Sequence, residues 1–212
     1  MQEAWNIFSK IMDDYSYDSI MKHRMLAIEE CYYSNNTTFE TEVLLSDESC
    51  KSLIDYTNRY INDKRLDTVD GLPEWQITYL QKDIEKLCTI SEIRNIIKIA
   101  YDKYPNISNV EFFVRKYGVG AREKLPWHSD MTVVSSTIHL SNYFEYDGGD
   151  FVFIEDAEIK RSSELKKGCG FFHNGNVIHK VESTTTGNRW SLIVFFFADH
   201  SEWSKEENKV IF

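Results

Sequence analysis

The stretch from Arg189 to Ala198 reads RWSLIVFFFA and consists mostly of β-branched, aromatic and aliphatic residues. Such residues favour extended strands, because their side chains pack well on a pleated surface. Similar short runs recur through the second half of the chain, and turns that contain glycine separate several of them. Many short strands at this spacing predict a β-sandwich or a barrel. The other runs are Val110–Tyr117, Thr132–Leu140, Asp150–Ile154, Gly168–Phe172 and Val177–Val181.

The first half of the chain predicts helices. We expect one or two helices within residues 1–38, the better one within Tyr17–Cys31. Glu42–Leu45 is a short strand candidate. Ser46 has the character of an N-cap with acidic residues behind it, and a further helix is expected from about Ser91 until Pro105 stops it. Apolar residues recur at helical spacing in both segments.

The chain of 212 residues has the length of one domain with a substantial core. No internal repeat or linker rich in Pro, Gly or Ser divides it, so we expect a single domain over residues 1–212. A helix-rich layer over residues 1–108 would cover one outer face of a β core over residues 109–200.

Composition restricts the class of protein. The net charge of −10 disfavours a nucleic-acid partner, because an acidic surface repels phosphates. The sequence has no basic region followed by an apolar run at its start, and no stretch of about 20 apolar residues, so neither a secretory signal nor a membrane partner is expected. The four cysteines are far apart and predict reduced, mostly buried thiols in a cytoplasmic protein: Cys31, Cys50, Cys88 and Cys169.

The segment Trp127-His128-Ser129-Asp130 carries the first chemical signal. Side chains two residues apart on an extended segment point to the same side, so His128 and Asp130 can reach one metal ion together. A third ligand must come from elsewhere, and His179 on a later predicted strand can supply it. Two imidazoles and one carboxylate leave three coordination positions open, which is typical of non-haem iron(II) sites that activate oxygen. Taken singly, each histidine is more simply explained as a surface or core residue.

Arg189 follows His179 by ten residues, and the polar segment Ser183–Asn188 between them suggests a hairpin turn. We therefore expect His179 and Arg189 on paired antiparallel strands. An arginine that faces into a barrel is costly unless an anion pairs with it, and its planar fork suits a carboxylate. Ser191 shares its face and can donate a further hydrogen bond. The distal carboxylate of 2-oxoglutarate would fit there, and the alternative partner is an internal Asp or Glu.

An ordered series of motifs between about Phe112 and Ala198 resembles the prolyl 4-hydroxylase-like branch of the Fe(II)/2-oxoglutarate-dependent dioxygenases, which includes the prolyl and lysyl hydroxylases. In order, the segments that carry the resemblance are Val114–Tyr117, His128–Asp130, Ser136–Ser141, Tyr146–Phe153, Lys167-Gly168, His179–Val181 and Thr186–Arg189.

The resemblance implies a mainly β fold with α, the double-stranded β-helix. This is a jelly-roll, cupin-like barrel with N-terminal helices packed on its outside. It also implies that the iron ligands are His128, Asp130 and His179, and that Arg189 binds the distal carboxylate of 2-oxoglutarate. Tyr117 matches a tyrosine that binds the same carboxylate in some members, although a half-buried strand residue would look the same.

Two histidines receive no role at this point. His139 stands where apolar residues are usual in the family, and it is interpreted as a strand residue. His173 precedes a turn and is left out of the ligand set. We expect the loops Asn142–Asp147 and Gly118–Pro126 to flank the mouth of the site, but nothing in the sequence identifies substrate-binding residues.

The resemblance implies a dioxygenase that hydroxylates an unactivated C–H bond of a prolyl or lysyl side chain in a peptide or protein. Its cofactors would be Fe(II), 2-oxoglutarate and O2, with ascorbate as a candidate reductant. A free amino acid or another small molecule is the alternative substrate, and a non-catalytic jelly-roll module that binds a metal or ligand is the alternative of another class. A nucleic-acid demethylase is disfavoured, because Phe195 stands where such enzymes carry a second arginine.

Overall fold

The structure, a computed structural model, describes residues 38–61, 64–156, 158–162, 166–198 and 206–211. None of the helices among these residues has the length and apolar character needed to cross a membrane. In chain order the elements are β1 (Thr38–Val43), α3 (Asp47–Tyr60), β2 (Gln76–Tyr79), α4 (Gln81–Ile84), α5 (Ile90–Lys103), β3 (Ile107–Gly118), β4 (Leu125–His128), β5 (Val134–His139), η1 (Tyr143–Glu145), β6 (Tyr146–Gly148), β7 (Phe151–Glu155), β8 (Glu158–Ser162), β9 (Cys169–Asn174), β10 (His179–Val181), β11 (Thr184–Ala198) and η2 (Glu206–Asn208).

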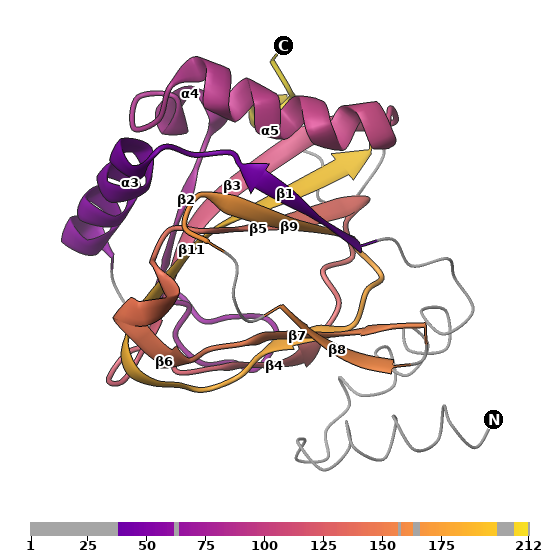
Figure 1. The fold of residues 1–212 in the computed structure, drawn as a ribbon. Helices are drawn as coiled ribbons and strands as arrows, with labels where there is room; N and C mark the ends of the chain where they lie inside the picture. The colour runs from indigo at the N-terminus through magenta and orange to yellow at the C-terminus, as the bar shows by residue number, and fades with distance from the viewer. Residues whose placement is uncertain (1–37, 62–63, 157, 163–165, 199–205, 212) are drawn as a thin grey trace.

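Two antiparallel sheets face each other (Figure 1). The large sheet has the order β1-β9-β5-β11-β3-β2, and β6 pairs with the beginning of β11. The small sheet has the order β4-β10-β7-β8. Long-range pairing dominates this arrangement, because β11 has β3 on one side and β5 on the other.

The helices cover the outer face of the large sheet, as Figure 1 shows for α4 and α5. The inner side of α5 is formed by Ile93, Ile96, Ile97 and Ala100, all buried, at the helical spacing that predicted this helix. They join one apolar cluster with the outward-facing residues of β11, which are Leu192, Val194 and Phe196. At about 25 cal/mol per Å² of apolar surface, burial of these side chains is the main force that holds the helical layer on the sheet.

Both described long helices begin where capping chemistry places them. The Ser46 hydroxyl accepts a hydrogen bond from the backbone N–H of Ser49 at the start of α3. Thr89 and Glu92 form a capping box at the start of α5, which begins at Ile90, one residue before the expected start near Ser91. Glu92 also accepts hydrogen bonds from the Ser46 backbone and the Ser49 hydroxyl, so the two helix starts are tied together.

The N-terminal half differs from the sequence prediction in its strands. β1 spans Thr38–Val43, whereas the expected strand was Glu42–Leu45. β2 was not predicted, although it completes one edge of the large sheet beside β3. The helix expected within Tyr17–Cys31 lies outside the described residues. Both strands occur in polar stretches whose pairing depends on partners far along the chain, so local pattern gives little signal for them.

The predicted pairing of His179 with Arg189 is wrong. β10, which begins at His179, pairs with β4 and β7 in the small sheet. The segment expected to be a hairpin turn, Ser183–Asn188, instead provides the first residues of β11, where Thr184 to Gly187 pair with β6. The chain therefore crosses from one sheet to the other between these residues, and His179 and Arg189 approach each other across the barrel.

Gly175 makes a close backbone approach that fixes the turn after β9. A Cβ at Gly175 would lie 2.0 Å from the carbonyl oxygen of Thr132, and the Gly175 carbonyl accepts hydrogen bonds from the N–H groups of Asp130 and Met131 at 3.0 and 3.3 Å. A side chain here must displace backbone, because no flexible group can move aside.

We expect Gly175→Ala to lower the free energy of unfolding by about 3 kcal/mol, the upper end of the usual cost of overpacking. Urea denaturation followed by circular dichroism measures this. Gly71→Ala is the control, because open space surrounds Gly71 and only its left-handed φ of 72° opposes a side chain. That conformation alone costs about 1 kcal/mol. Equal losses in the two variants would contradict the steric account.

Candidate active site

His128, Asp130 and His179 meet between the two sheets. His128 ends β4, His179 begins β10, and the two are direct cross-strand partners. Their ring centroids are 4.1 Å apart. One oxygen of Asp130 lies 3.5 Å from Nε2 of His128 and 3.6 Å from Nε2 of His179. One candidate ligand atom from each residue lies within 4.8 Å of the others.

The orientation of both imidazoles is fixed from behind. Nδ1 of His128 lies 2.8 Å from the Pro126 carbonyl oxygen, and Nδ1 of His179 lies 2.9 Å from that of Val177. A carbonyl can only accept, so each Nδ1 carries the proton and donates it. Each Nε2 then presents its lone pair towards the space beside Asp130, which is the arrangement that metal-binding histidines require.

Asp130 remains a carboxylate in this buried setting. Burial alone would raise its pKa, but the imidazoles of His179, His128 and His173 hold the pKa of this carboxyl well below its ordinary value. Burial lowers the pKa of His179 and of His173, which favours the neutral form of both rings. Neutral imidazoles beside an ionised carboxylate are the protonation states that bind a metal cation. The donor set of two imidazoles and one carboxylate fits an Fe(II) site.

Arg189 lies inside the barrel with 1% of its surface exposed, and none of its three guanidinium nitrogens has a hydrogen-bond partner among the described residues. Its cross-strand neighbour is Tyr117, whose ring lies 5.2 Å from the guanidinium carbon. A Cβ at Gly149 would lie 2.9 Å from Cδ of Arg189, so the glycine leaves room for this side chain. A buried guanidinium without a partner is costly, and an anionic ligand would remove that cost.

Three further buried polar atoms that have no hydrogen-bond partner in the described part of the chain surround Arg189. They are the hydroxyl oxygens of Ser191 and Thr184 and Nε2 of His139. Ser191 is two residues from Arg189 on the same strand face, and His139 is the cross-strand neighbour of Ser191 on β5. Together these groups can donate several hydrogen bonds to one carboxylate.

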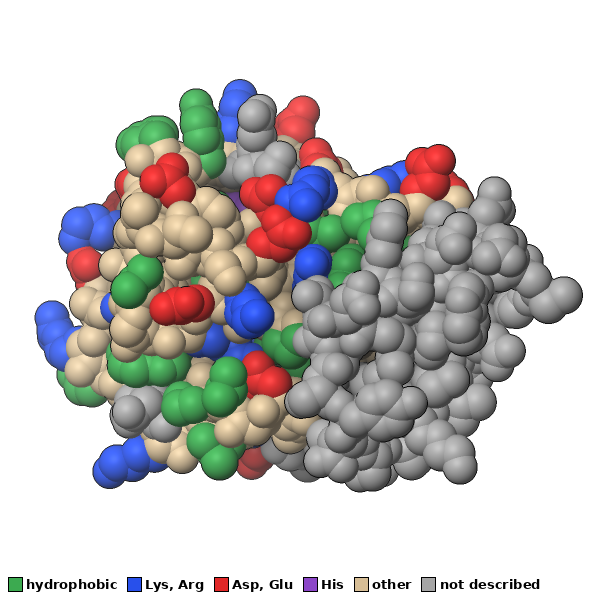
Figure 2. Space-filling model, turned by 90° about the horizontal axis from the view of Figure 1, so that it is seen from below, with side chains coloured by type: hydrophobic (Ala, Val, Ile, Leu, Met, Phe, Trp, Pro, Cys, Tyr) green, Lys and Arg blue, Asp and Glu red, His purple; other side chains and the backbone are tan. Residues whose placement is uncertain are grey.

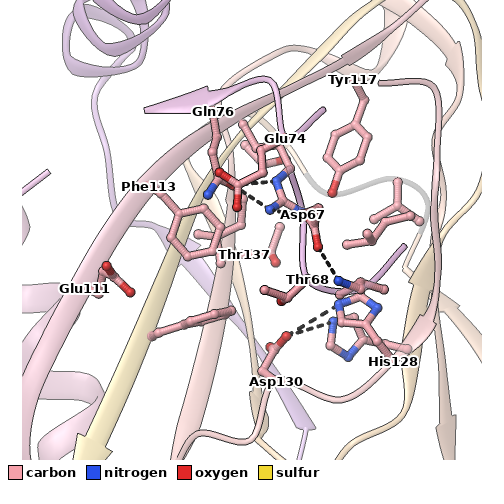
Figure 3. Close-up of a pocket in the computed structure, with 18 of the residues that line it drawn as sticks. Asp67, Thr68, Glu74, Gln76, Glu111, Phe113, Tyr117, His128, Asp130 and Thr137 are labelled. Atoms are coloured by element: carbon pink, nitrogen blue, oxygen red, sulfur yellow. Dashed lines mark hydrogen bonds and ion pairs between the residues drawn. The ribbon is translucent and has the colours of Figure 1, made fainter. Parts of the chain in front are cut away.

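One cavity of about 260 Å³ connects the two groups of residues, because Arg189 and Ser191 line it together with His128, Asp130 and His179. In Figure 3 the Tyr117 hydroxyl and the paired His128 and Asp130 side chains point into this common space. The structure thus brings together all six residues that the sequence singled out, although through opposite sheets and not through a hairpin.

Comparisons by sequence match only part of the chain to a known protein. No family model matches the chain. A curated PKHD-type hydroxylase of Delftia acidovorans is 30% identical over 79 residues, which cover 37% of this chain. The match spans only about a third of the length of that relative, 34%.

Solved structures cover more of the chain. A prolyl-4-hydroxylase of Pseudomonas putida has a TM-score of 0.55 at 17% identity, over 82% of this chain and 97% of that one. The viral collagen prolyl hydroxylase of Paramecium bursaria Chlorella virus-1, solved with 2-oxoglutarate, has a TM-score of 0.57 at 14% identity, over 79% of this chain and 98% of that one. The fold is the double-stranded β-helix. The predicted fold class and the resemblance to the prolyl 4-hydroxylase-like oxygenases are confirmed.

His173 is a residue of this β-helix that the sequence reading left out. It is 1% exposed, and its Nε2 lies 3.7 Å from the second carboxylate oxygen of Asp130. Its ring centroid is 4.6 Å from that of His179. The available signal was the alternation along β9, which places His173 on the same inward face as Phe171.

The segment before β2 also contributes to the site, although the sequence prediction gave it no role. Asp67 and Arg115 form a buried ion pair at 2.9 Å, Arg115 donates to Gln76, and Arg122 pairs with Asp70 at 2.7 Å. Burial favours the neutral form of Asp67, yet Arg115 holds the pKa of this carboxyl below its ordinary value. These pairs hold the segment beside the cavity.

The expected mouth loops contribute less than predicted. Of the residues 118–126, Leu125 lines the cavity, whereas the lining includes Arg65, Asp67, Thr68 and Val69 from the segment before β2. Those residues belong to a stretch without hydrophobic periodicity, so sequence pattern alone had assigned them no position.

His139 should make stability depend on pH. Burial, together with the Arg189 guanidinium, lowers the pKa of His139 to about 3. In the unfolded chain the pKa is about 6.5. Between these two values the unfolded state binds a proton that the folded state does not, so this residue makes the folded state less stable as the pH falls through that window.

For the metal-free protein, we expect His139 to account for about 2 kcal/mol of the stability lost between about pH 7.5 and about pH 5. Urea denaturation at the two pH values measures the loss in the unaltered protein and in His139→Gln. Groups other than His139 contribute equally to both proteins. The variant should therefore lose about 2 kcal/mol less, and identical losses would show that His139 titrates normally in the folded state.

Proposed function

We propose that this chain is an Fe(II)/2-oxoglutarate-dependent dioxygenase that hydroxylates an unactivated C–H bond. One observation carries the proposal: a fully buried guanidinium that the described residues leave without a hydrogen-bond partner shares a cavity with two imidazoles and a carboxylate. The first group requires an anion and the second suits a ferrous ion. A molecule that satisfies both must be an anion that can also bind the metal, and a 2-oxo dicarboxylate has this character.

In this proposal His128, Asp130 and His179 hold the iron. Arg189 binds the distal carboxylate of 2-oxoglutarate, with hydrogen bonds from Ser191 and Tyr117. His139, which had no role in the sequence prediction, donates a further hydrogen bond. When bound, iron and 2-oxoglutarate supply the activation of O2, with succinate and CO2 as co-products. The chain itself supplies orientation and exclusion of bulk water, since the ligand side chains and Arg189 are all buried.

The presence of Asp130 favours hydroxylation. A halogenase of this kind needs the carboxylate position vacant for a halide ion. Here Asp130 fills that position: its backbone N–H donates to the Gly175 carbonyl, and its carboxylate lies beside the imidazoles of His128, His173 and His179. The fold likeness to prolyl hydroxylases supports a prolyl or lysyl side chain in a peptide or protein as substrate, and a free amino acid is the alternative.

We also propose that residues 1–212 act as one domain in the cytoplasm, with no nucleic-acid partner. Cys50, Cys88 and Cys169 are buried free thiols in the described part of the chain, which suits a reducing compartment. Lys and Arg side chains are interspersed with Asp and Glu on the face that Figure 2 shows, a pattern unlike the basic stripe of a nucleic-acid binder.

The direct assay supplies the purified protein with Fe(II), ascorbate as reductant and 2-oxoglutarate, and measures succinate. We expect slow succinate release without substrate, and loss of both this release and metal retention in Asp130→Ala. Metal retention is measured separately by Mn(II) titration followed by electron paramagnetic resonance. Asp55→Ala, at an exposed position on α3, is the control and should retain the metal. A protein that binds metal but releases no succinate would favour the non-catalytic module.

We expect Arg189→Ala to raise the 2-oxoglutarate concentration for half-maximal succinate release by about 10- to 100-fold, because a hydrogen bond to a charged group contributes about 1.5–3 kcal/mol. Mn(II) binding should be retained, since Arg189 is not in the candidate ligand set. The control is Arg161→Ala, whose side chain is half exposed on β8. An unchanged 2-oxoglutarate requirement in Arg189→Ala would remove Arg189 from the cosubstrate site.

A further inference from the structure

The end of the cavity away from Arg189 has aromatic walls. The inward residues of β11 beyond Ser191 are Ile193, Phe195 and Phe197, and all line the cavity with Phe113 of β3. The Phe113 and Phe195 rings meet edge to face with centroids 4.8 Å apart. Phe195 and Phe197 also meet edge to face, at 6.2 Å. Aromatic faces in such a wall attract a cation as well as apolar groups.

Glu111 is the carboxylate of this aromatic end. It is the cross-strand neighbour of Phe195, it is half-buried, and it lines the same cavity. Figure 3 shows Glu111 and Phe113 projecting from β3 beside each other. Within the described residues Glu111 has no hydrogen bond or ion pair, whereas the other acids of this region, Asp67 and Glu74, are paired with Arg115 and Arg65.

The sheet register places Glu111 in line with the candidate metal site. His173, which contacts Asp130, is opposite Ser135 on β5. Ser135 is opposite Phe195 on β11, and Phe195 is opposite Glu111 on β3. Three strand spacings therefore separate the backbones of His173 and Glu111, about 14 Å. Side chains from both ends shorten this gap, so an aliphatic chain of a few carbons can span it with its charged end at Glu111.

We propose that the substrate carries a cationic group, an ammonium or a guanidinium, which binds against Glu111 and the aromatic wall at Phe195; the Phe113 ring already has the Arg115 guanidinium 5.5 Å from its centroid. The proposal rests on the proposed function, because it assigns the group that positions the substrate for oxidation. A neutral aliphatic chain of equal length would leave the half-buried carboxylate without a partner, whereas a cation satisfies both the carboxylate and the rings. The cation can come from a side chain of a peptide or from a free amine.

The test measures binding by isothermal titration without oxygen, to the protein loaded with Mn(II) and 2-oxoglutarate. The probes are Nα-acetyl-lysine N-methylamide, which keeps its ε-ammonium group, and its uncharged norleucine analogue. The arginine and proline counterparts and butylammonium complete the set. We expect the lysine or arginine probe to bind at least 10-fold tighter than the norleucine and proline probes. Tight binding of butylammonium as well would assign a free amine as the source, and preference for the amide-flanked probes would assign a peptide.

Glu111→Gln is the matched variant and should remove the preference for a charged probe over the norleucine probe, because the two side chains have nearly the same shape. Glu158→Gln, at an exposed position on β8, should keep the preference. Mn(II) and 2-oxoglutarate titrations of Glu111→Gln show whether the variant is folded. If it does not bind them, Phe195→Leu replaces it and should weaken the charged probe more than the norleucine probe.

Two results would overturn the proposal: equal binding of charged and uncharged probes by the unaltered protein, or an undiminished charge preference in folded Glu111→Gln (in Phe195→Leu, where that variant replaces it). These failures are distinct from failure of the proposed function. If the proposed function failed, the unaltered protein would release no succinate from 2-oxoglutarate with Fe(II) present, whatever probe is added. A protein that releases succinate but shows no charge preference would retain the dioxygenase proposal and lose only the role of Glu111.

Discussion

The organisation of this barrel depends on a buried positive charge that the described residues leave without a partner. Arg189 is fully enclosed, yet its guanidinium makes no hydrogen bond with them. Removal of such a charge from water costs several kcal/mol unless a counter-charge replaces the lost hydration. The hydroxyls of Ser191 and Thr184 and the imidazole of His139 are equally unsatisfied. A fold that retains four such groups in one place is adapted to hold an anion, and its stability in the empty state is correspondingly reduced.

The second constraint is the crossing of the chain between the two sheets. His179 is fixed in the small sheet by its pairing with His128, while Arg189 is fixed in the large sheet by its pairing with Tyr117. They are ten residues apart along the chain, but they face each other across the interior. The candidate metal ligands and the candidate anion donors therefore lie on opposite walls, and a ligand held between them would bridge the two sheets. Binding of such a ligand should stabilise the folded state through this bridge.

Sequence pattern predicted what depends on neighbours along the chain. The cap at Ser46, the buried face of α5 and the strand runs have local signals of period or hydrogen bonding. Likewise, the His128 and Asp130 pair needs only two adjacent positions and an extended backbone. The sheet partner of His179, the inward placement of His173 and the position of Asp67 depend on register between distant segments. A polar segment such as Ser183–Asn188 is compatible with a turn or with a strand, and only the partner β6 decides between them.

The charges along the cavity also explain how two different ligands could be kept in their own positions. Asp67 and Glu74 are neutralised by ion pairs with Arg115 and Arg65, so they contribute little net field. Among the residues that the structure describes, Arg189 has no counter-charge at one end of the cavity, and the Glu111 carboxylate has no ion pair at the other. A dicarboxylate is attracted to the first and repelled by the second, and a cationic substrate experiences the reverse. In this cavity, the opposition would assign each ligand its end and place the carbon between them near the three candidate metal ligands.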